Sequence, residues 1–384
     1  IESSHREYHS CMIEFRSGDD HFAYALACKG YADASMLLGN YAETEDAYED
    51  ALVTFRRFDY ELLSAFVINN LGVLKKRACD YSASFRLVSR ARTIYARYCV
   101  NNELLNSAKN LGNICFRLGE WKAARRWLEE ASAIEHQLMA AGSRCESEIG
   151  WSLATTLEHL LLTQRNFRDA ERMLLACDIR SSEGPPHIVA LVHEFLGELY
   201  CEIGDYDQST HRLNEACELA NAALPSGELM GEILRRQAQL QLCQNQLIDA
   251  RATALRCIRL SQKIGDRYEY AAALRVLGEV YVARKEGPKA AGCFRTAVHT
   301  LKSIHECYEL MRALYAQGRF LATTDKQDEA EIALLEARQL SKKLELEYYQ
   351  ALIAIAMVET IGPQERFEEA QSWVLEATTL RDHL

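Results

Sequence analysis

His5 and His9 are the first residues in the chain whose types and spacing could do chemistry. Four residues apart on one face of a helix, two imidazoles can bind zinc, and Cys11 is the nearest third ligand. Histidine pairs at this spacing are common on helices, and a plain surface face explains the pair without a metal. We therefore predict no metal site and no cofactor.

The motifs that usually carry catalysis are absent from the sequence. It has no Walker loop, no G-x-S-x-G nucleophile elbow and no H-E-x-x-H zinc motif. Glu158 and His159 are adjacent, and a polar groove surface explains them without catalysis. The sequence predicts a protein that is not an enzyme.

The sequence repeats with a period of about 40 residues, and these repeats must position any functional residue. A period of this length indicates stacked supersecondary units, each of which buries its apolar face only against its neighbours. A mostly bulky residue opens the second half of each unit, and we call it the marker. The steps between markers are nearly equal, except for a longer one between Trp121 and Phe167. The nine markers are Tyr41, Tyr81, Trp121, Phe167, Tyr206, Leu247, Gly287, Gln327 and Phe367.

Small residues recur at fixed distances from each marker. They occur nine positions before it, as at Gly72 and Gly112, and three and ten positions after it, as at Ala124 and Ala131. These offsets fit helices rather than strands, and small side chains allow two helices to approach closely. The pattern predicts an all-α fold, an α-α superhelical solenoid of antiparallel helix pairs.

Composition narrows the classes of partner. The net charge of −11 argues against nucleic acid, because phosphate binding needs clustered positive charge. No uncharged apolar stretch reaches about 18 residues, so we expect no membrane-spanning helix and no membrane partner. The 13 cysteines include no C-x-x-C pair, and Cys177 and Cys257 occupy positions where other units carry alanine. With no signal peptide, these features predict a cytoplasmic protein with thiols that pack in the core.

The spacing of small and bulky residues resembles the tetratricopeptide repeat. The resemblance rests on the small residue before the marker, the marker itself, and the small residue and alanine after it, as in Gly112, Trp121, Ala124 and Ala131. It covers almost the whole chain, but the units exceed the common repeat length of about 34 residues and lack the closing proline. Long repeats of this kind resemble the sensor arrays of MalT-type transcription activators, and similar ones occur in animal polarity adaptors.

We expect a single solenoid over residues 1–384, in three stretches. Residues 1–16 form the second helix of a partial repeat, residues 20–183 hold repeats one to four, and residues 187–384 hold repeats five to nine. The long step before Phe167 places extra residues in 139–148, and Gly184-Pro185-Pro186 is expected to exclude helix and mark a bend. No polar capping helix follows residue 384, so we expect flanking domains of the same polypeptide, or a bound partner, to continue the array.

In tetratricopeptide arrays the first helix of each unit lines the inner groove, and the resemblance assigns that role to two rows here. The first row lies twelve positions before the marker, and the second lies one turn later. Lys29 with Asp33 and Arg275 with Glu279 are opposite charges four residues apart, which need no ligand. Glu194 and Glu198 repel each other, and we expect Arg235 and Arg236 to neutralise them.

The remaining polar residues of these rows are the candidates for binding. Asparagine can donate to and accept from a peptide backbone, and lysine can pair with a carboxylate. The set on the earlier helices loosely resembles the Lys and Asn clamp of some tetratricopeptide domains, without reproducing its full pattern. Solvated groove surface is the simpler explanation for such charges. The predicted contact residues are Asn69, Asn106, Lys109, Asn113, Arg117, Arg235, Arg312, Tyr315 and Arg319.

The sequence therefore predicts a non-catalytic module of a larger signalling or regulatory protein. Its concave groove would bind a protein or peptide segment. Two alternatives stay open: a small-molecule sensor, which the MalT-type resemblance implies, and a passive scaffold or spacer.

Overall fold

The chain consists of helices throughout the residues that the structure describes. The computed structural model describes residues 2–16, 18–38, 40–140, 165–181, 185–223, 227–324 and 326–383. These residues contain 18 α-helices, one 3-10 helix and no strand, so the predicted all-α solenoid is confirmed. The chain divides into two compact units: Ile1–Phe116 with Lys122–Leu157, and Arg117–Trp121 with Glu158–Leu384.

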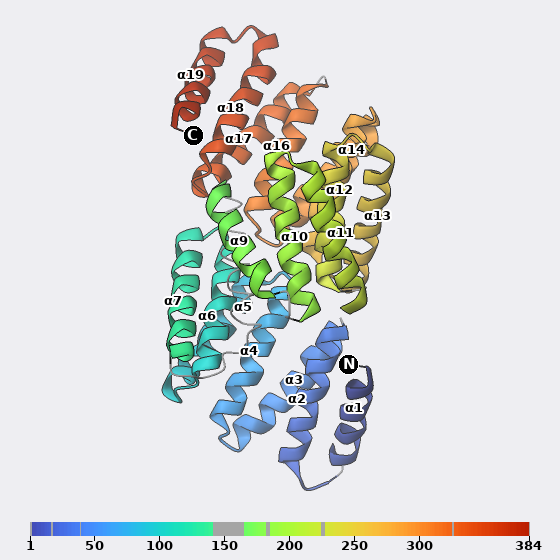
Figure 1. Cartoon of the computed structure of the whole chain (residues 1–384), viewed down its shortest axis with the longest axis vertical. Coiled ribbons are helices and arrows are strands. Elements are labelled where there is room, and N and C mark those ends of the chain that lie inside the picture. Colours follow the sequence, from blue (N-terminus) through green and yellow to red (C-terminus); the bar gives the residue numbers. More distant parts are fainter. Residues whose placement is uncertain are drawn as a thin grey trace. The chain divides into compact units, whose positions relative to one another are not determined.

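The helices follow one another as antiparallel neighbours within each unit (Figure 1). The earlier helices are α1 (Glu2–Arg16), α2 (His21–Leu38), α3 (Tyr41–Arg57), α4 (Glu61–Arg77), α5 (Tyr81–Arg97), α6 (Asn101–Arg117) and α7 (Trp121–Ala140). The later ones are α9 (Phe167–Ser181), α10 (Pro186–Ile203), α11 (Tyr206–Ala223), α12 (Glu228–Cys243), α13 (Leu247–Ile264), α14 (Arg267–Ala283), α15 (Gly287–Ser303), α16 (Tyr308–Ala322), α17 (Gln327–Lys343), α18 (Glu347–Ile361), η1 (Gly362–Gln364) and α19 (Phe367–His383).

Every marker residue is the first residue of a helix. The nine helices α3, α5, α7, α9, α11, α13, α15, α17 and α19 begin at the nine predicted markers, from Tyr41 to Phe367. Each is the second helix of its pair. Where the structure describes the residue two positions before the marker, that residue takes a left-handed conformation, at φ 74° for Gly119 and φ 86° for Gly204. Cys79 and Lys285 adopt the same conformation, so the fold imposes this turn even on residues that rarely take it.

The small residues before each marker admit a large side chain from the second helix. A Cβ atom built on Gly112 would lie 2.7 Å from Leu128, and one on Gly278 would lie 2.6 Å from the ring of Phe294. In both pairs the large residue lies seven positions after the marker. Leu128 and Phe294 are each 1% exposed, so this close approach builds the core of a helix pair.

The small residues after each marker complete the packing. Ser84 Oγ donates to the Gly72 carbonyl at 2.6 Å, and Ser209 Oγ donates to the Gly197 carbonyl at 2.7 Å. The residue ten positions after the marker is fully buried at Ala131 in α7, but only half-buried at Ala377 in α19. Within the described residues no disulfide joins the cysteines.

Three further expectations from the sequence concern the ends and junctions of the helices. One agrees with the structure, one is wrong, and one lies partly outside the described residues. Glu2–Arg16 is a helix, as expected for residues 2–16. Pro186 does not exclude helix but is the first residue of α10, where its missing N–H is not needed. Residues 141–148 and Gly184 lie outside the described residues, as do Glu158 and His159, and the three-stretch division stays a prediction.

The predicted histidine pair lies on α1. His5 Nε2 is 3.0 Å from Ser35 Oγ, and the rings of His5 and His9 pack against Tyr31 at centroid distances of 4.6 and 5.4 Å. The described residues hold no group of three His, Cys, Asp or Glu side chains that could bind a metal. His5 therefore packs partly between α1 and α2, whereas His9 is exposed and touches Tyr31 from the surface.

Candidate binding faces on the first helices

Successive first helices pack directly on one another, so their rows of side chains come together. Within the second unit α10 contacts α12, α12 contacts α14, α14 contacts α16, and α16 contacts α18. In the first unit α2 contacts α4 in the same way. We use "inner row" for the residues twelve positions before the marker and those within one turn of them.

On α2 the inner row is satisfied internally. Lys29 Nζ lies 2.7 Å from Asp33 Oδ2, which realises the predicted pair four residues apart. Asn70 of α4 donates to Asp33 Oδ1 at 2.9 Å, and the Tyr48 hydroxyl donates to the same oxygen. This carboxylate thus ties α2, α3 and α4 together.

On α4 and α6 the inner row carries amides that have no side-chain hydrogen bond to any described residue. Asn69 is 3% exposed, and its Oδ1 atom accepts no hydrogen bond within the described residues. Asn106, Lys109 and Asn113 follow one another on one face of α6, and all three are half-buried. Neither Asn106 nor Asn113 has a side-chain hydrogen bond to the described part of the chain. The structure therefore places three predicted contact residues on successive turns of α6, and Asn69 at the equivalent position of α4.

On α12 the inner row is filled by arginines that are already paired. Arg235 is 6% exposed, and its Nε and Nη2 atoms reach the two oxygens of Glu269 at 2.7 and 3.4 Å. Arg236 forms ion pairs with Glu194 and Glu198 of α10. The predicted neutralisation of these two glutamates is thus carried by Arg236, whereas Arg235 bonds forward to α14.

The same arrangement continues from α14 to α16. Arg275 is 2% exposed and forms an ion pair with Glu309 of α16. Its Nη1 atom also donates to Glu279 at 2.7 Å and to Gln239 at 3.3 Å. Arg312 approaches the second oxygen of Glu309 at 3.5 Å. An unbroken series of buried ion pairs therefore joins α10, α12, α14 and α16.

Electrostatics keep the central carboxylate of this series ionised. Burial alone would raise the pKa of Glu309, but Arg275 and Arg312 beside it hold that pKa below its usual value. The space among Glu198, Arg235, Arg236 and Arg312 is about 20 Å³, room for one or two water molecules. This part of the second unit's inner row is packed by its own charges.

Comparison with known proteins identifies the repeat. A tetratricopeptide repeat model matches residues 63–135, from α4 to α7. A Rap protein complexed with Competence and Sporulation Factor superposes with a TM-score of 0.56 at 14% identity, over 83% of this chain and 98% of that one. A STAND protein with a tetratricopeptide repeat sensor, from Pyrococcus horikoshii, gives 0.50 at 12% identity, over 83% of this chain and 49% of that one. No curated protein matches the chain.

The chain is a tetratricopeptide repeat (TPR)-like helical solenoid. The match to the repeat model and the superposed structures agree on this fold, as the sequence predicted. The TPR-like array is consistent with a protein-interaction or regulatory module, and the repeat fold is generally non-catalytic. None of the described helices is long and apolar enough to cross a lipid bilayer.

The predicted contact residues of the TPR-like array fall into different surroundings. Asn106, Lys109 and Asn113 lie on one face of α6, and Asn69 lies at the equivalent position of α4. Arg117 lies in the last turn of α6. The side chains of Arg235 and Arg312 are bonded to glutamates, and the exposed Arg319 lies 5.8 Å from the ring of Tyr315 on α16. A binding role for each of the nine stays a prediction.

Two of the glutamates that pair with inner-row arginines, Glu269 and Glu309 on the next first helix, were not foreseen. The separation along the chain is 34 from Arg235 to Glu269 and again 34 from Arg275 to Glu309. This recurrence is visible in the sequence of a TPR-like array once the repeat length is known. It places the glutamate near the start of the next first helix, opposite the arginine in the preceding one.

Proposed function

We propose that the array is a non-catalytic binding module of a larger regulatory protein. It would hold a peptide or protein segment against the inner row of α4 and α6. The support is the contrast between amides without internal partners in this row and the paired arginines of α12 and α14. A buried amide oxygen without a partner costs about 1–3 kcal/mol, so folding alone does not explain Asn69.

The chemistry of the four residues fits an extended peptide. Asn69, Asn106 and Asn113 each offer one carbonyl acceptor and one amide donor, which matches the donors and acceptors of a peptide backbone. The Lys109 ammonium, between Asn106 and Asn113 on α6, is suited to a carboxylate. The superposed Rap protein holds Competence and Sporulation Factor, which supports ligand binding by an array of this fold.

The test uses pools of short fluorescein-labelled peptides, with free or amidated C-termini, and binding read by anisotropy. We expect at least one pool to bind, with Asn113→Ala weakening it about fivefold and Lys109→Glu about tenfold or more. If Lys109 contacts a terminal carboxylate, Lys109→Glu should weaken binding of the pool with free C-termini and leave the amidated pool unchanged.

The matched control is Lys263→Glu, a charge reversal at an exposed position of α13. It should leave binding unchanged. A wild-type array that binds no pool would contradict the proposal and favour a spacer. Thermal stabilisation by a metabolite library without any peptide binding would favour the small-molecule sensor.

A further inference from the structure

One stretch of the first unit is positively charged, although the chain as a whole is acidic. The whole chain has a net charge of −11, but residues 54–98 contain nine Lys and Arg against three Asp and Glu. Helix α5 contributes four arginines and no acidic residue. Its exposed arginines Arg86, Arg90 and Arg97 follow one stripe of the helix at spacings of four and seven residues. We call these three residues the arginine stripe.

Two members of the arginine stripe have no counter-charge of their own. Arg97 pairs with Glu61 at 2.5 Å, but neither Arg86 nor Arg90 forms a hydrogen bond or ion pair with any described residue. Arg56, at the end of α3, is close enough to Arg90 for the two charges to repel each other. The pKa of Arg56 is lowered, mainly by burial and further by the charge of Arg90. Like charges gathered this way are unfavourable until an anion joins them.

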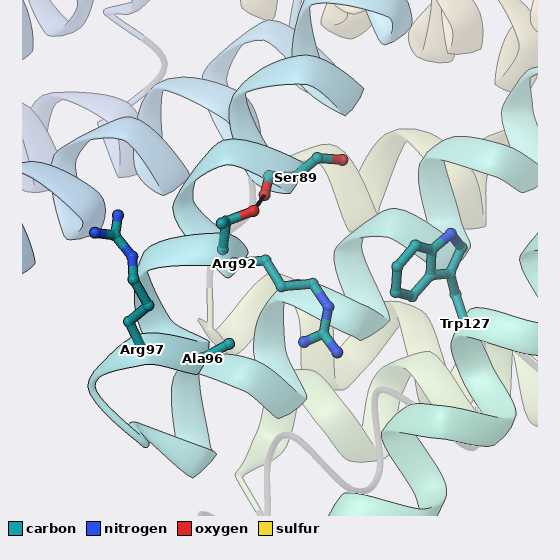
Figure 2. Close-up of a pocket in the computed structure, with 6 residues that line it drawn as sticks. Ser89, Arg92, Ala96, Arg97 and Trp127 are labelled. Atoms are coloured by element: carbon teal, nitrogen blue, oxygen red, sulfur yellow. Dashed lines mark hydrogen bonds between the residues drawn. The ribbon is translucent and has the colours of Figure 1, made fainter.

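A groove runs beside the arginine stripe, between α5 and α7. Its volume is about 680 Å³, and it is lined by Ser89, Arg92, Thr93, Ala96, Arg97 and Trp127. Figure 2 shows Arg92 reaching from α5 toward the Trp127 ring, while Arg97 extends to the other side of the helix.

Arg92 holds the wall of this groove in place. Its Nη1 atom donates to the Leu104 carbonyl at 3.2 Å, its Nη2 atom pairs with Glu130, and its guanidinium lies 5.3 Å from the centre of the Trp127 ring. Arg92 is thus committed to the protein, whereas Arg86 and Arg90 remain available to a partner. The methyl of Ala96 and the face of Trp127 add an apolar surface beside them.

We propose that the arginine stripe and the groove form a second docking surface, for an acidic protein segment that carries an apolar side chain. Carboxylates of the segment would pair with the guanidinium groups of Arg86 and Arg90, which suit bidentate contacts. The apolar side chain would enter the groove beside Trp127. Nucleic acid fits less well, because a phosphate backbone uses only the charges and the remainder of the chain is acidic. This surface is separate from the inner row, so the array would hold two partners at once.

The test measures binding of a labelled, end-blocked, glutamate-rich peptide with one central phenylalanine. We expect the double variant Arg86→Glu with Arg90→Glu to weaken binding at least tenfold. Replacing the peptide's phenylalanine by alanine should weaken its binding to the wild-type protein severalfold. The same replacement should weaken binding to the Trp127→Leu variant less. Circular dichroism should show unchanged folding of the double variant, because both arginines are exposed.

Arg256→Glu with Arg259→Glu on α13 is the control, since these are also exposed arginines of a second helix. The proposal is wrong if this control loses as much affinity as the double variant, or if the double variant binds like the wild type. Tighter binding of a single-stranded DNA oligonucleotide than of the acidic peptide would also overturn it. None of these outcomes depends on the peptide pools used for the inner row.

Discussion

Asn69 and Arg275 occupy the same position of the repeat in two different units, yet their surroundings are opposite. Both lie twelve residues before a marker on a first helix, and both are almost fully buried. The Arg275 guanidinium bonds to Glu279, Glu309 and Gln239, whereas the Asn69 carbonyl accepts nothing from the described residues. One repeat position thus fastens neighbouring helices in the second unit and leaves bonding capacity unused in the first.

The difference shows how a repeat can separate stability from binding. The glycine and alanine positions that pack each helix pair are shared by both units, so they cannot give either unit its own role. The inner row is not tied to these glycine and alanine positions and differs from unit to unit. Where the inner row carries arginine and glutamate, it joins successive repeats; where it carries amides, it leaves the acceptors that we propose a peptide uses.

The largest expected effect comes from breaking the ion pairs of the second unit. Arg275→Met removes the main partner of Glu309, which is 1% exposed, and leaves a buried charge poorly compensated. We expect the free energy of unfolding to fall by about 3–5 kcal/mol, measured by urea titration with circular dichroism.

The double variant Arg275→Met with Glu309→Leu distinguishes the loss of the ion pair from the cost of leaving the Glu309 carboxylate buried without its partner. It should recover most of the loss, because a well-packed apolar pair often replaces a buried ion pair at little cost. A single variant as stable as the wild type would show that the series of ion pairs does not hold these repeats together.

A second difference between the units is sensitivity to pH. Glu306, just before α16, accepts backbone N–H bonds from Tyr308, Glu309 and Leu310 at 3.1, 2.7 and 3.1 Å. Burial, with a further contribution from the Glu309 charge, raises the pKa of Glu306 to about 7. The corresponding positions after α3 and α5 in the first unit are Tyr60 and Val100, which carry no such charge.

The sign of the pH effect follows from the raised pKa. The folded chain binds a proton at Glu306 more tightly than the unfolded chain, so the stability that Glu306 contributes is greatest at low pH and falls as pH rises from about 4.3 to about 7. We expect Glu306→Gln to remove up to about 3 kcal/mol of this fall, measured as urea midpoints at several pH values. Glu368→Gln, at an exposed position of α19, should keep the wild-type profile.

The packing shared by the two units should respond equally in both. Gly278→Ala and Gly112→Ala each force a neighbouring ring or leucine to move, and we expect each to cost about 1–3 kcal/mol. A Cβ atom on Gly292 in α15 would meet no other atom within 4 Å, so Gly292→Ala should stabilise its helix by about 1 kcal/mol. Thermal melts of the three variants make this comparison. If Gly112→Ala and Gly278→Ala lowered stability by very different amounts, packing would also differ between the units.

The sequence alone predicts the parts of the fold that repeat. The markers locate the first residue of every second helix, because a bulky residue and its small partners recur at fixed offsets. The prediction that Gly184-Pro185-Pro186 excludes helix was wrong at Pro186, because proline suits the first turn of a helix. A proline pair alone does not distinguish a break in a helix from its beginning.

The candidate site was less predictable, because it depends on contacts between repeats. Arg235 resembles a groove residue in sequence, and only the approach of α14 shows that Glu269 bonds to it. Asn69 gives no sign in the sequence that its carbonyl lacks a partner. The arginines of α5 stand out only after the fold shows which of them have counter-charges.

The smallest expected effect tests the first unit directly. Asn69→Leu replaces an unsatisfied amide with an apolar side chain of similar size, so we expect the urea midpoint to rise by the equivalent of about 1 kcal/mol. The neighbouring Asn70→Leu is the matched control, since Asn70 donates to Asp33 and its loss should lower the midpoint. If Asn69 serves binding, Asn69→Leu should also weaken the peptide pools that bind the wild type. If the Asn69→Leu variant were less stable than the wild type, Asn69 would be a structural residue. Asn69 and Arg275 would then both stabilise the fold and differ only in how much.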